Sequence, residues 1–161
     1  MMVQSWIAPF VMASINTKNV HRSNMLLGHS YGKDFVYDEM MVTGRGERGE
    51  AMAMAITNDT SMAESKTKQG DGPSEEEREN GYYDVLMVWE HTDGRSVRIS
   101  VKGDKDPGYG STSKMIAEIA VCLIKHPDLG AGGIWTTAPV MGAELIERLQ
   151  ANAGLTFAVE S

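Results

Sequence analysis

The chain has 161 residues and a formal net charge of -7, with 42% hydrophobic and 23% charged residues. This length suits one domain with a real core, and the composition is that of a water-soluble globular protein. The acidic balance and the lack of any Lys/Arg run argue against a nucleic-acid-binding surface. No apolar stretch is long enough to span a bilayer, and the N-terminus lacks the basic region of a signal peptide, so we expect a cytoplasmic protein.

The N-terminal segment has helical periodicity. A helix is predicted from Ser5 to about Ile15, with one apolar stripe made of Trp6, Ile7, Phe10, Val11 and Ile15. The polar run Arg22-Ser23-Asn24 is interpreted as a solvated face of the continuing segment, which Gly28 ends.

A glycine pattern follows the strand-like segment Phe35 to Val42. Gly44-Arg45-Gly46-Glu47-Arg48-Gly49 has the G-x-G-x-x-G spacing of dinucleotide-binding turns. That fingerprint needs a nearly all-apolar parallel strand before it, whereas Tyr37-Asp38-Glu39 is polar. We therefore interpret the glycines as a turn before a helix from about Glu47 to Glu64.

The middle of the chain predicts a polar, mobile loop at about residues 65–80, followed by a hairpin. Ser74 and Glu77 match a capping box, and the adjacent acidic run is interpreted as a solvated surface rather than a metal site. Strands are predicted from Tyr82 to Glu90 and from Ser96 to Lys102, because Asp93-Gly94 between them is a strong hairpin signal.

The best-defined helix follows the loop Asp106 to Gly110. Ser111, Thr112 or Ser113 is predicted to cap it, and Cys122 is expected to be a buried, inert thiol. Loop amides and Lys114 at such a helix start could hold an anion, although geometry alone favours an ordinary capped helix.

The C-terminal part completes the predicted fold. Residues 132–137 suggest a short strand or an extended loop, Val140 to Asn152 a helix stopped by Gly154, and Leu155 to Val159 a strand. The sum is one α+β domain over residues 1–161, with a mostly antiparallel sheet of about four strands and helices packed on one face.

Several motifs together resemble one enzyme family. The run Asp106-Pro107-Gly108-Tyr109-Gly110-Ser111-Thr112-Ser113-Lys114-Met115 looks like the signature of bacterial saccharopine dehydrogenase-like oxidoreductases, which include the trans-acting enoyl reductases. Four other stretches resemble the same family in the same order: residues 9–13 with 22–24, residues 70–74, residues 132–136, and residues 141–149 with 154–157.

The resemblance covers nearly the whole chain and implies the C-terminal, substrate-binding domain of such an enzyme. The family's Rossmann domain is then expected in cis or in trans, and NAD(P) is expected for the full-length enzyme, with no cofactor bound by this chain. The further partners expected are a small-molecule substrate and a second copy in a homodimer, with no nucleic acid and no membrane span. By resemblance, the residues expected to bind substrate are Arg22, Tyr109, Ser111, Thr112 and Lys114.

The chain departs from the family pattern at two positions. His21 stands where a second arginine is expected, and Thr137 where a proline is expected. Two alternatives to the oxidoreductase hypothesis stay open, namely a free-standing anion-binding module and an inactive truncated product.

Overall fold

The computed structural model describes residues 4–59 and 72–160. The chain divides into two compact units, which we call unit 1 (described residues 4–59) and unit 2 (described residues 72–160). Each unit is treated by itself below, and the prediction that residues 1–161 form one domain stays a prediction. No helix in the described ranges is long and apolar enough to cross a membrane.

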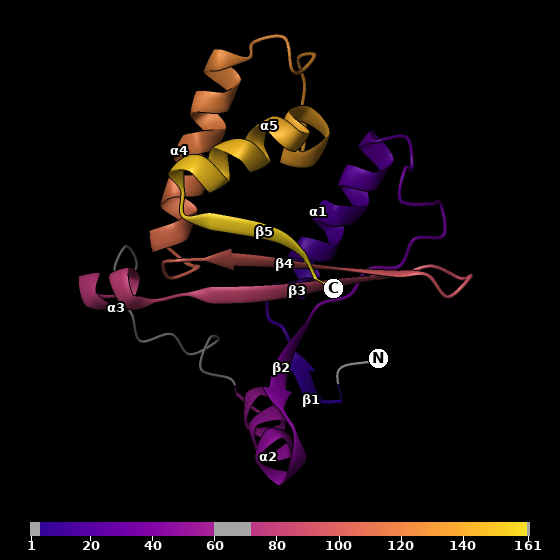
Figure 1. The fold of residues 1–161 in the computed structure, drawn as a ribbon, viewed down its shortest axis with the longest axis vertical. Coiled ribbons are helices and arrows are strands. Elements are labelled where there is room, and N and C mark those ends of the chain that lie inside the picture. The colour runs from indigo at the N-terminus through magenta and orange to yellow at the C-terminus, as the bar shows by residue number, and fades with distance from the viewer. Residues whose placement is uncertain (1–3, 60–71, 161) are drawn as a thin grey trace. The chain divides into compact units, whose positions relative to one another are not determined.

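Unit 1 contains a two-stranded antiparallel sheet and two helices. Its elements are β1 (Trp6–Pro9), α1 (Ala13–Leu26), β2 (Met40–Gly44) and α2 (Gly46–Thr57) (Figure 1). The helix α2 packs against both strands, and Ala8 and Ala53 are the buried hydrophobic residues of the unit's described part.

The predicted N-terminal helix from Ser5 is wrong. Residues Trp6–Pro9 form a strand that pairs with β2, so that Ile7 lies opposite Val42, and helical conformation begins only at Ala13. The pairing partner lies more than thirty residues further along the chain, which a local periodicity cannot detect. The predicted stop near Gly28 is confirmed, because α1 ends at Leu26 and Gly28 has a φ of 67°.

The interpretation of Ser23 and Asn24 as a solvated face is also wrong, since they are the buried residues of α1. The Asn24 side-chain amide donates to the Gly32 carbonyl over 2.8 Å, and its oxygen accepts from the Tyr31 amide over 2.9 Å. Asn24 therefore holds the loop after α1 in place with a buried polar side chain whose hydrogen bonds are made.

The glycine turn between β2 and α2 has a backbone explanation. Gly44 and Gly46 have φ values of 106° and 64°, and a Cβ on Gly49 would lie 2.3 Å from the Gly44 carbonyl oxygen. The strand before the turn pairs antiparallel. The turn before a helix is thus confirmed, with α2 starting at Gly46. The predicted extension of this helix to about Glu64 is wrong, because α2 ends at Thr57 with Asn58 as its C-cap; residues 60–64 lie outside the described residues.

Unit 2 is a three-stranded antiparallel sheet in the order β3-β4-β5 with three helices. Its elements are α3 (Glu75–Asn80), β3 (Tyr83–Glu90), β4 (Ser96–Gly103), α4 (Gly110–Lys125), α5 (Thr137–Asn152) and β5 (Leu155–Glu160) (Figure 1). The predicted hairpin is confirmed, with Val85 opposite Val101 and Trp89 opposite Val97. The Ser74–Glu77 capping box at the start of α3 is confirmed as well.

The core of unit 2 lies where α4, α5 and β5 meet. Its buried members are Cys122, Met141, Leu145, Leu149, Ala153 and Leu155. Cys122 has no exposed surface, which confirms the prediction of a buried thiol.

The α+β class is confirmed, with the strands distributed over two small sheets rather than one of about four. Residues 132–136 form no strand, and α5 begins at Thr137 instead of Val140. Gly142, with a φ of 42°, interrupts helical conformation inside α5. The last strand and the stop at Gly154 are confirmed, since Gly154 has a φ of 73° and β5 begins directly after it.

Candidate functional site

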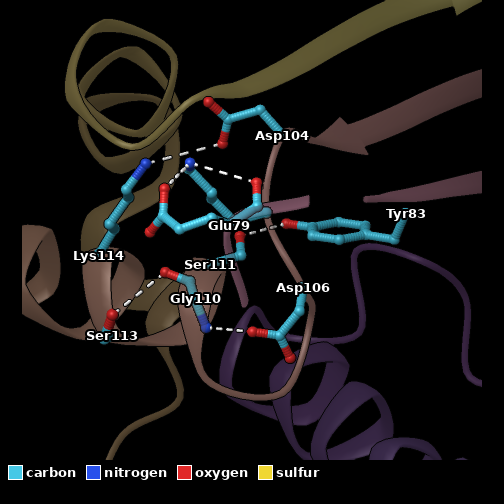
Figure 2. A network of polar contacts seen from close by, with 9 residues as sticks. Glu79, Tyr83, Asp104, Asp106, Gly110, Ser111, Ser113 and Lys114 are labelled. Atoms are coloured by element: carbon cyan, nitrogen blue, oxygen red, sulfur yellow. Dashed lines mark hydrogen bonds and ion pairs between the residues drawn. The ribbon is translucent and has the colours of Figure 1, made fainter. Parts of the chain in front are cut away.

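The candidate site is the loop from β4 into α4, residues 104–110, together with the first turn of α4. Asp106 organises this loop. Its carboxylate accepts hydrogen bonds from the backbone amides of Gly108, Tyr109 and Gly110, and its carbonyl accepts from the Ser111 amide over 2.8 Å. Figure 2 shows the bond from the Gly110 amide. These bonds, led by the one from Gly110, lower the pKa of the Asp106 carboxyl below its ordinary value.

The predicted cap by Ser111, Thr112 or Ser113 is therefore wrong. All three residues lie inside α4, and Asp106 supplies the oxygen atoms that accept from the Gly108 amide before the helix and from the Gly110 amide at its first residue. An Asp-Pro-Gly sequence is a typical turn initiator, and that was the signal from which Asp106 could have been recognised. The loop amides considered for an external anion already donate to the Asp106 carboxylate, although the N-cap residue Tyr109 makes no side-chain capping hydrogen bond.

Ser111 is a buried link between α4 and the sheet. Its side chain has no exposed surface, and its hydroxyl is hydrogen-bonded to the Tyr83 hydroxyl over 2.9 Å (Figure 2). The Tyr83 ring lies so close to Gly103 that a Cβ there would be 2.2 Å from it. Ser111 thus fixes the start of α4 against β3 and has no free surface in unit 2 for direct contact with a substrate.

Thr112 and Lys114 lie in the first turn of α4 with more exposure. The Thr112 hydroxyl donates to the Pro107 carbonyl over 2.6 Å, which closes the loop over the helix start. The Lys114 ammonium lies 3.7 Å from an Asp104 carboxylate oxygen, a loose ion pair at the surface (Figure 2). Both residues keep polar atoms near solvent at the same end of α4.

Tyr109 is the large exposed side chain of the loop, with 56% of its surface accessible. Gly72 lies against its ring, since a Cβ on Gly72 would be 3.4 Å from the nearest ring carbon. The motif at Gly72-Pro73-Ser74 and the motif at Asp106–Gly110, far apart in sequence, are therefore neighbours in space.

Arg78 fastens these two segments together, and sequence reasoning did not identify it. Its guanidinium donates to the Pro73 carbonyl over 2.6 Å, and its own carbonyl accepts from the Asp106 amide over 3.2 Å. Lys105 also forms an ion pair with Glu79 of α3, which lowers the pKa of that carboxyl. Both lysines at the loop, Lys105 and Lys114, thus have acidic neighbours, which weakens the loop's attraction for a free anion.

Arg22 lies on α1 in unit 1, where it is exposed. It belongs to a different unit from the other four predicted residues and is considered separately from them. Within the described residues, no group of three or more His, Cys, Asp or Glu side chains is arranged to hold a metal ion. Unit 1 also has a shallow hollow of about 300 Å³ at the start of α2, lined by Gln4, Ser5, Trp6, Arg45 and Gly46.

Comparison with known proteins finds similar chains among mycobacterial enoyl reductases. A Mycobacterium tuberculosis (strain ATCC 25618 / H37Rv) protein, provisionally named a trans-acting enoyl reductase, is 34% identical over 171 residues, which cover 94% of this chain and 41% of that protein. The trans-acting enoyl reductases of Mycobacterium bovis (strain BCG / Pasteur 1173P2) and Mycobacterium ulcerans (strain Agy99) are 31% and 29% identical, each over 89% of this chain and 39% of the relative.

The chain thus spans about two fifths of the length of these relatives. No protein-family model matches it. No solved structure matches it either. These relatives are named trans-acting enoyl reductases, and the saccharopine dehydrogenase-like relationship of the chain stays a prediction.

Proposed function

We propose that this chain is the substrate-binding part of an NAD(P)-dependent oxidoreductase of the enoyl reductase kind, with the C-terminal domain of saccharopine dehydrogenase-like enzymes as its architecture. The observation that carries the proposal is the similarity of 94% of the chain to about two fifths of proteins named trans-acting enoyl reductases. A Rossmann domain, in cis or in trans, would then bind the dinucleotide.

The glycine turn of unit 1 supports the assignment of the cofactor to another domain. A dinucleotide turn follows a parallel strand of a βαβ unit, whereas β2 pairs antiparallel with β1. Gly49 is explained by its close approach to Gly44 without any ligand. In the whole enzyme the nicotinamide would supply a hydride to the carbon–carbon double bond of an enoyl group, and the residues of this chain would hold that group.

Tyr109 is the centre of the proposed substrate site. Its exposed ring offers an apolar surface for an acyl chain, and Thr112 and Lys114 place a hydroxyl and an ammonium at the same helix end. Lys114 could turn from the loose contact with Asp104 towards a carbonyl oxygen. Ser111 contributes indirectly, since its bond to Tyr83 fixes this helix end. Arg22 lies in the other unit, and its role in binding substrate stays a prediction from the resemblance.

The free-standing anion-binding module has weaker support than the oxidoreductase. The backbone amides that would bind the anion are taken by Asp106, and a second negative charge beside that carboxylate would be repelled. An inactive truncated product would have the same fold as the proposed substrate-binding part, but it would bind no substrate.

A calorimetric titration of the purified chain with NADPH and then NADH tests the cofactor assignment. We expect no heat of binding from either. Micromolar binding of one of them would contradict the assignment and would make the glycine turn at Gly44–Gly49 a dinucleotide site.

Binding of a short trans-2-enoyl thioester, followed by protein fluorescence, tests the substrate site. Tyr109→Ala is expected to weaken binding up to about tenfold, since roughly 0.5–1.5 kcal/mol of aromatic contact is lost. Tyr82→Ala is the matched control, because Tyr82 is an exposed tyrosine of the same unit, 80% accessible and outside the loop. Equal binding by all three proteins would exclude Tyr109, and no binding by the unmodified chain would favour the inactive product.

A further inference from the structure

Asp104 is the acidic neighbour of Lys114 at the start of α4, and it lies two residues before the loop motif that begins at Asp106. The Lys114 ammonium is 3.7 Å from one Asp104 carboxylate oxygen (Figure 2). This distance suits an ion pair but is too long for a hydrogen bond. Among the residues that the structure describes, none accepts a hydrogen bond from this ammonium. Asp104 therefore attracts Lys114 by charge and leaves the three N–H donors of the ammonium available.

The place of Asp104 is set by the backbone at the end of α5. Gly103, the last residue of β4, pairs with Leu155 at the start of β5. A Cβ on Gly154 would lie 2.3 to 2.4 Å from the three atoms of the Asp104 carboxyl group, so the carboxylate lies directly against the Gly154 backbone. The strand register and this glycine together hold a carboxylate beside the first turn of α4, next to Lys114.

The other lysine of the loop is bound more tightly than Lys114. Lys105 forms an ion pair with Glu79 of α3, also donates to the Glu79 carbonyl over 3.4 Å, and has only 22% of its side chain exposed, against 38% for Lys114. The pKa of Lys105 is raised, first by its hydrogen bond to Glu79 and also by the charge of Asp104. The pKa of Glu79 is lowered, first by its hydrogen bond to Lys105 and also by the charge of Lys114. The four charges thus alternate in sign, so Asp104 keeps Lys105 beside it when Lys114 turns away.

We propose that Asp104 is a positioning residue of the substrate site, which holds the Lys114 ammonium at the start of α4 with its N–H donors free for the carbonyl oxygen of an acyl substrate. This inference rests on the proposed function, in which Lys114 binds that oxygen. A lysine side chain without a partner samples many rotamers, and confining it beforehand reduces the entropy that is lost on binding. Asp104 acts on the substrate through Lys114 and makes no contact with it.

A double-mutant cycle tests the proposal, with binding of a short trans-2-enoyl thioester to the full chain as the measurement. Lys114→Met is expected to weaken binding about tenfold, because a charge-assisted hydrogen bond is lost. Asp104→Asn is expected to weaken binding about threefold, which is the order of an exposed charge pair. In the Lys114→Met background, Asp104→Asn should have no effect. An effect of the same size in both backgrounds, or no weakening in the first, would overturn the proposal.

Two further variants separate the charge of Asp104 from its shape and from the charge of the whole chain. Asp104→Glu restores the carboxylate and should recover most of the affinity that Asp104→Asn loses; a failure to recover it would overturn the proposal. Asp93→Asn is the matched control, because Asp93 is also exposed and ion-paired, with Arg95, at the opposite end of β4 from the loop. It should bind the thioester like the unmodified chain, and a loss equal to that of Asp104→Asn would overturn the proposal.

The proposed function and the role of Asp104 fail in different ways. No binding of the thioester by the unmodified chain would contradict the proposed function, and the role of Asp104 with it. Binding that Tyr109→Ala weakens and Lys114→Met does not would support the substrate site and overturn the role of Asp104. The side chains of Asp104 and Lys114 are 54% and 38% exposed, so we expect every variant to fold, which circular dichroism measures.

Discussion

The two units of this chain differ in how they are held together. Unit 2 has six buried core residues, which lie on α4, α5 and β5 and at Ala153 directly after α5. A largely buried ion pair between Glu118 and Arg148 joins its two long helices. In its described part, unit 1 buries the two alanines Ala8 and Ala53, the glycine Gly49, and the polar Ser23 and Asn24. One unit is held by apolar packing, and the other mainly by strand pairing and hydrogen bonds.

The apolar residues of unit 1 are present but uncovered. Ile7 and Val42 face each other across the sheet and are 54% and 61% exposed, and Ile15 on α1 is 52% exposed. Since about 25 cal/mol of stability comes from each Å² of apolar surface buried, unit 1 gains little from these side chains by itself. This difference fits the proposal that the chain works as part of a larger enzyme.

The largest expected effect is on the core of unit 2. Leu149→Ala should lower the free energy of unfolding by about 2–5 kcal/mol, because it removes buried methyl groups and leaves a cavity. Ile15→Ala in unit 1 should change it by less than about 0.5 kcal/mol, since Ile15 is largely exposed. Urea denaturation followed by circular dichroism measures both, and equal losses would contradict the difference in packing between the units.

The ion pair between α4 and α5 should have the next largest effect. Glu118 also accepts a hydrogen bond from Asn152, and Arg148 is only 17% exposed. Glu118→Gln is expected to lower the free energy of unfolding by about 2 kcal/mol, because the Arg148 guanidinium would lose its charged partner at a position that water reaches poorly. Glu147→Gln, at an exposed position on α5, is the control in the same denaturation assay, and an equal loss there would show that the pair contributes nothing specific.

The polar support of unit 1 depends on Asn24. Asn24→Ala should lower the free energy of unfolding by about 1–2 kcal/mol, because the Tyr31 amide and the Gly32 carbonyl lose their hydrogen-bond partner. Hydrogen exchange of residues 28–35 should become faster, while unit 2 should be unaffected. Exposed Asn19→Ala is the control, and unchanged exchange in Asn24→Ala would show that another contact holds this loop.

The smallest expected effect is a pH dependence at the loop before α4. The folded chain holds the pKa of Asp106 below its ordinary value of 3.8, so its contribution to stability is present above about pH 4 and is lost as the pH falls through the folded pKa. The urea midpoint of the unmodified chain should fall more steeply than that of Asp106→Asn below about pH 4. Parallel curves would mean that the Asp106 charge does not stabilise the loop.

Local features of this fold could be predicted from the sequence, and non-local ones could not. The Asp93-Gly94 hairpin and the Ser74–Glu77 capping box follow from residues next to one another, and both are confirmed. The strand β1 was mistaken for a helix because its partner, β2, comes some thirty residues later. The sequence favoured a solvated Asn24, because the helical pattern of apolar residues does not show that the following loop, which carries Tyr31 and Gly32, folds back onto this side chain.

The loop before α4 could be predicted from the sequence, but the contacts inside it could not, and its role as a substrate site stays a prediction. Tyr109 and Lys114 are at the surface of the helix start, as an exposed loop would suggest. Ser111 is buried against Tyr83, which comes from a strand 28 residues earlier. Arg78 was missed because it acts through backbone carbonyls of two segments that only the folded chain brings together.

Hydrogen exchange of the whole chain tests the central comparison most directly. If unit 2 has its own core and unit 1 does not, the amides of α4, α5 and β4 should be the slowest in the chain, and those of α1, β1 and β2 should exchange many times faster. Equal protection of the two units would contradict the account, since it would show that unit 1 is packed as stably as unit 2 without a partner.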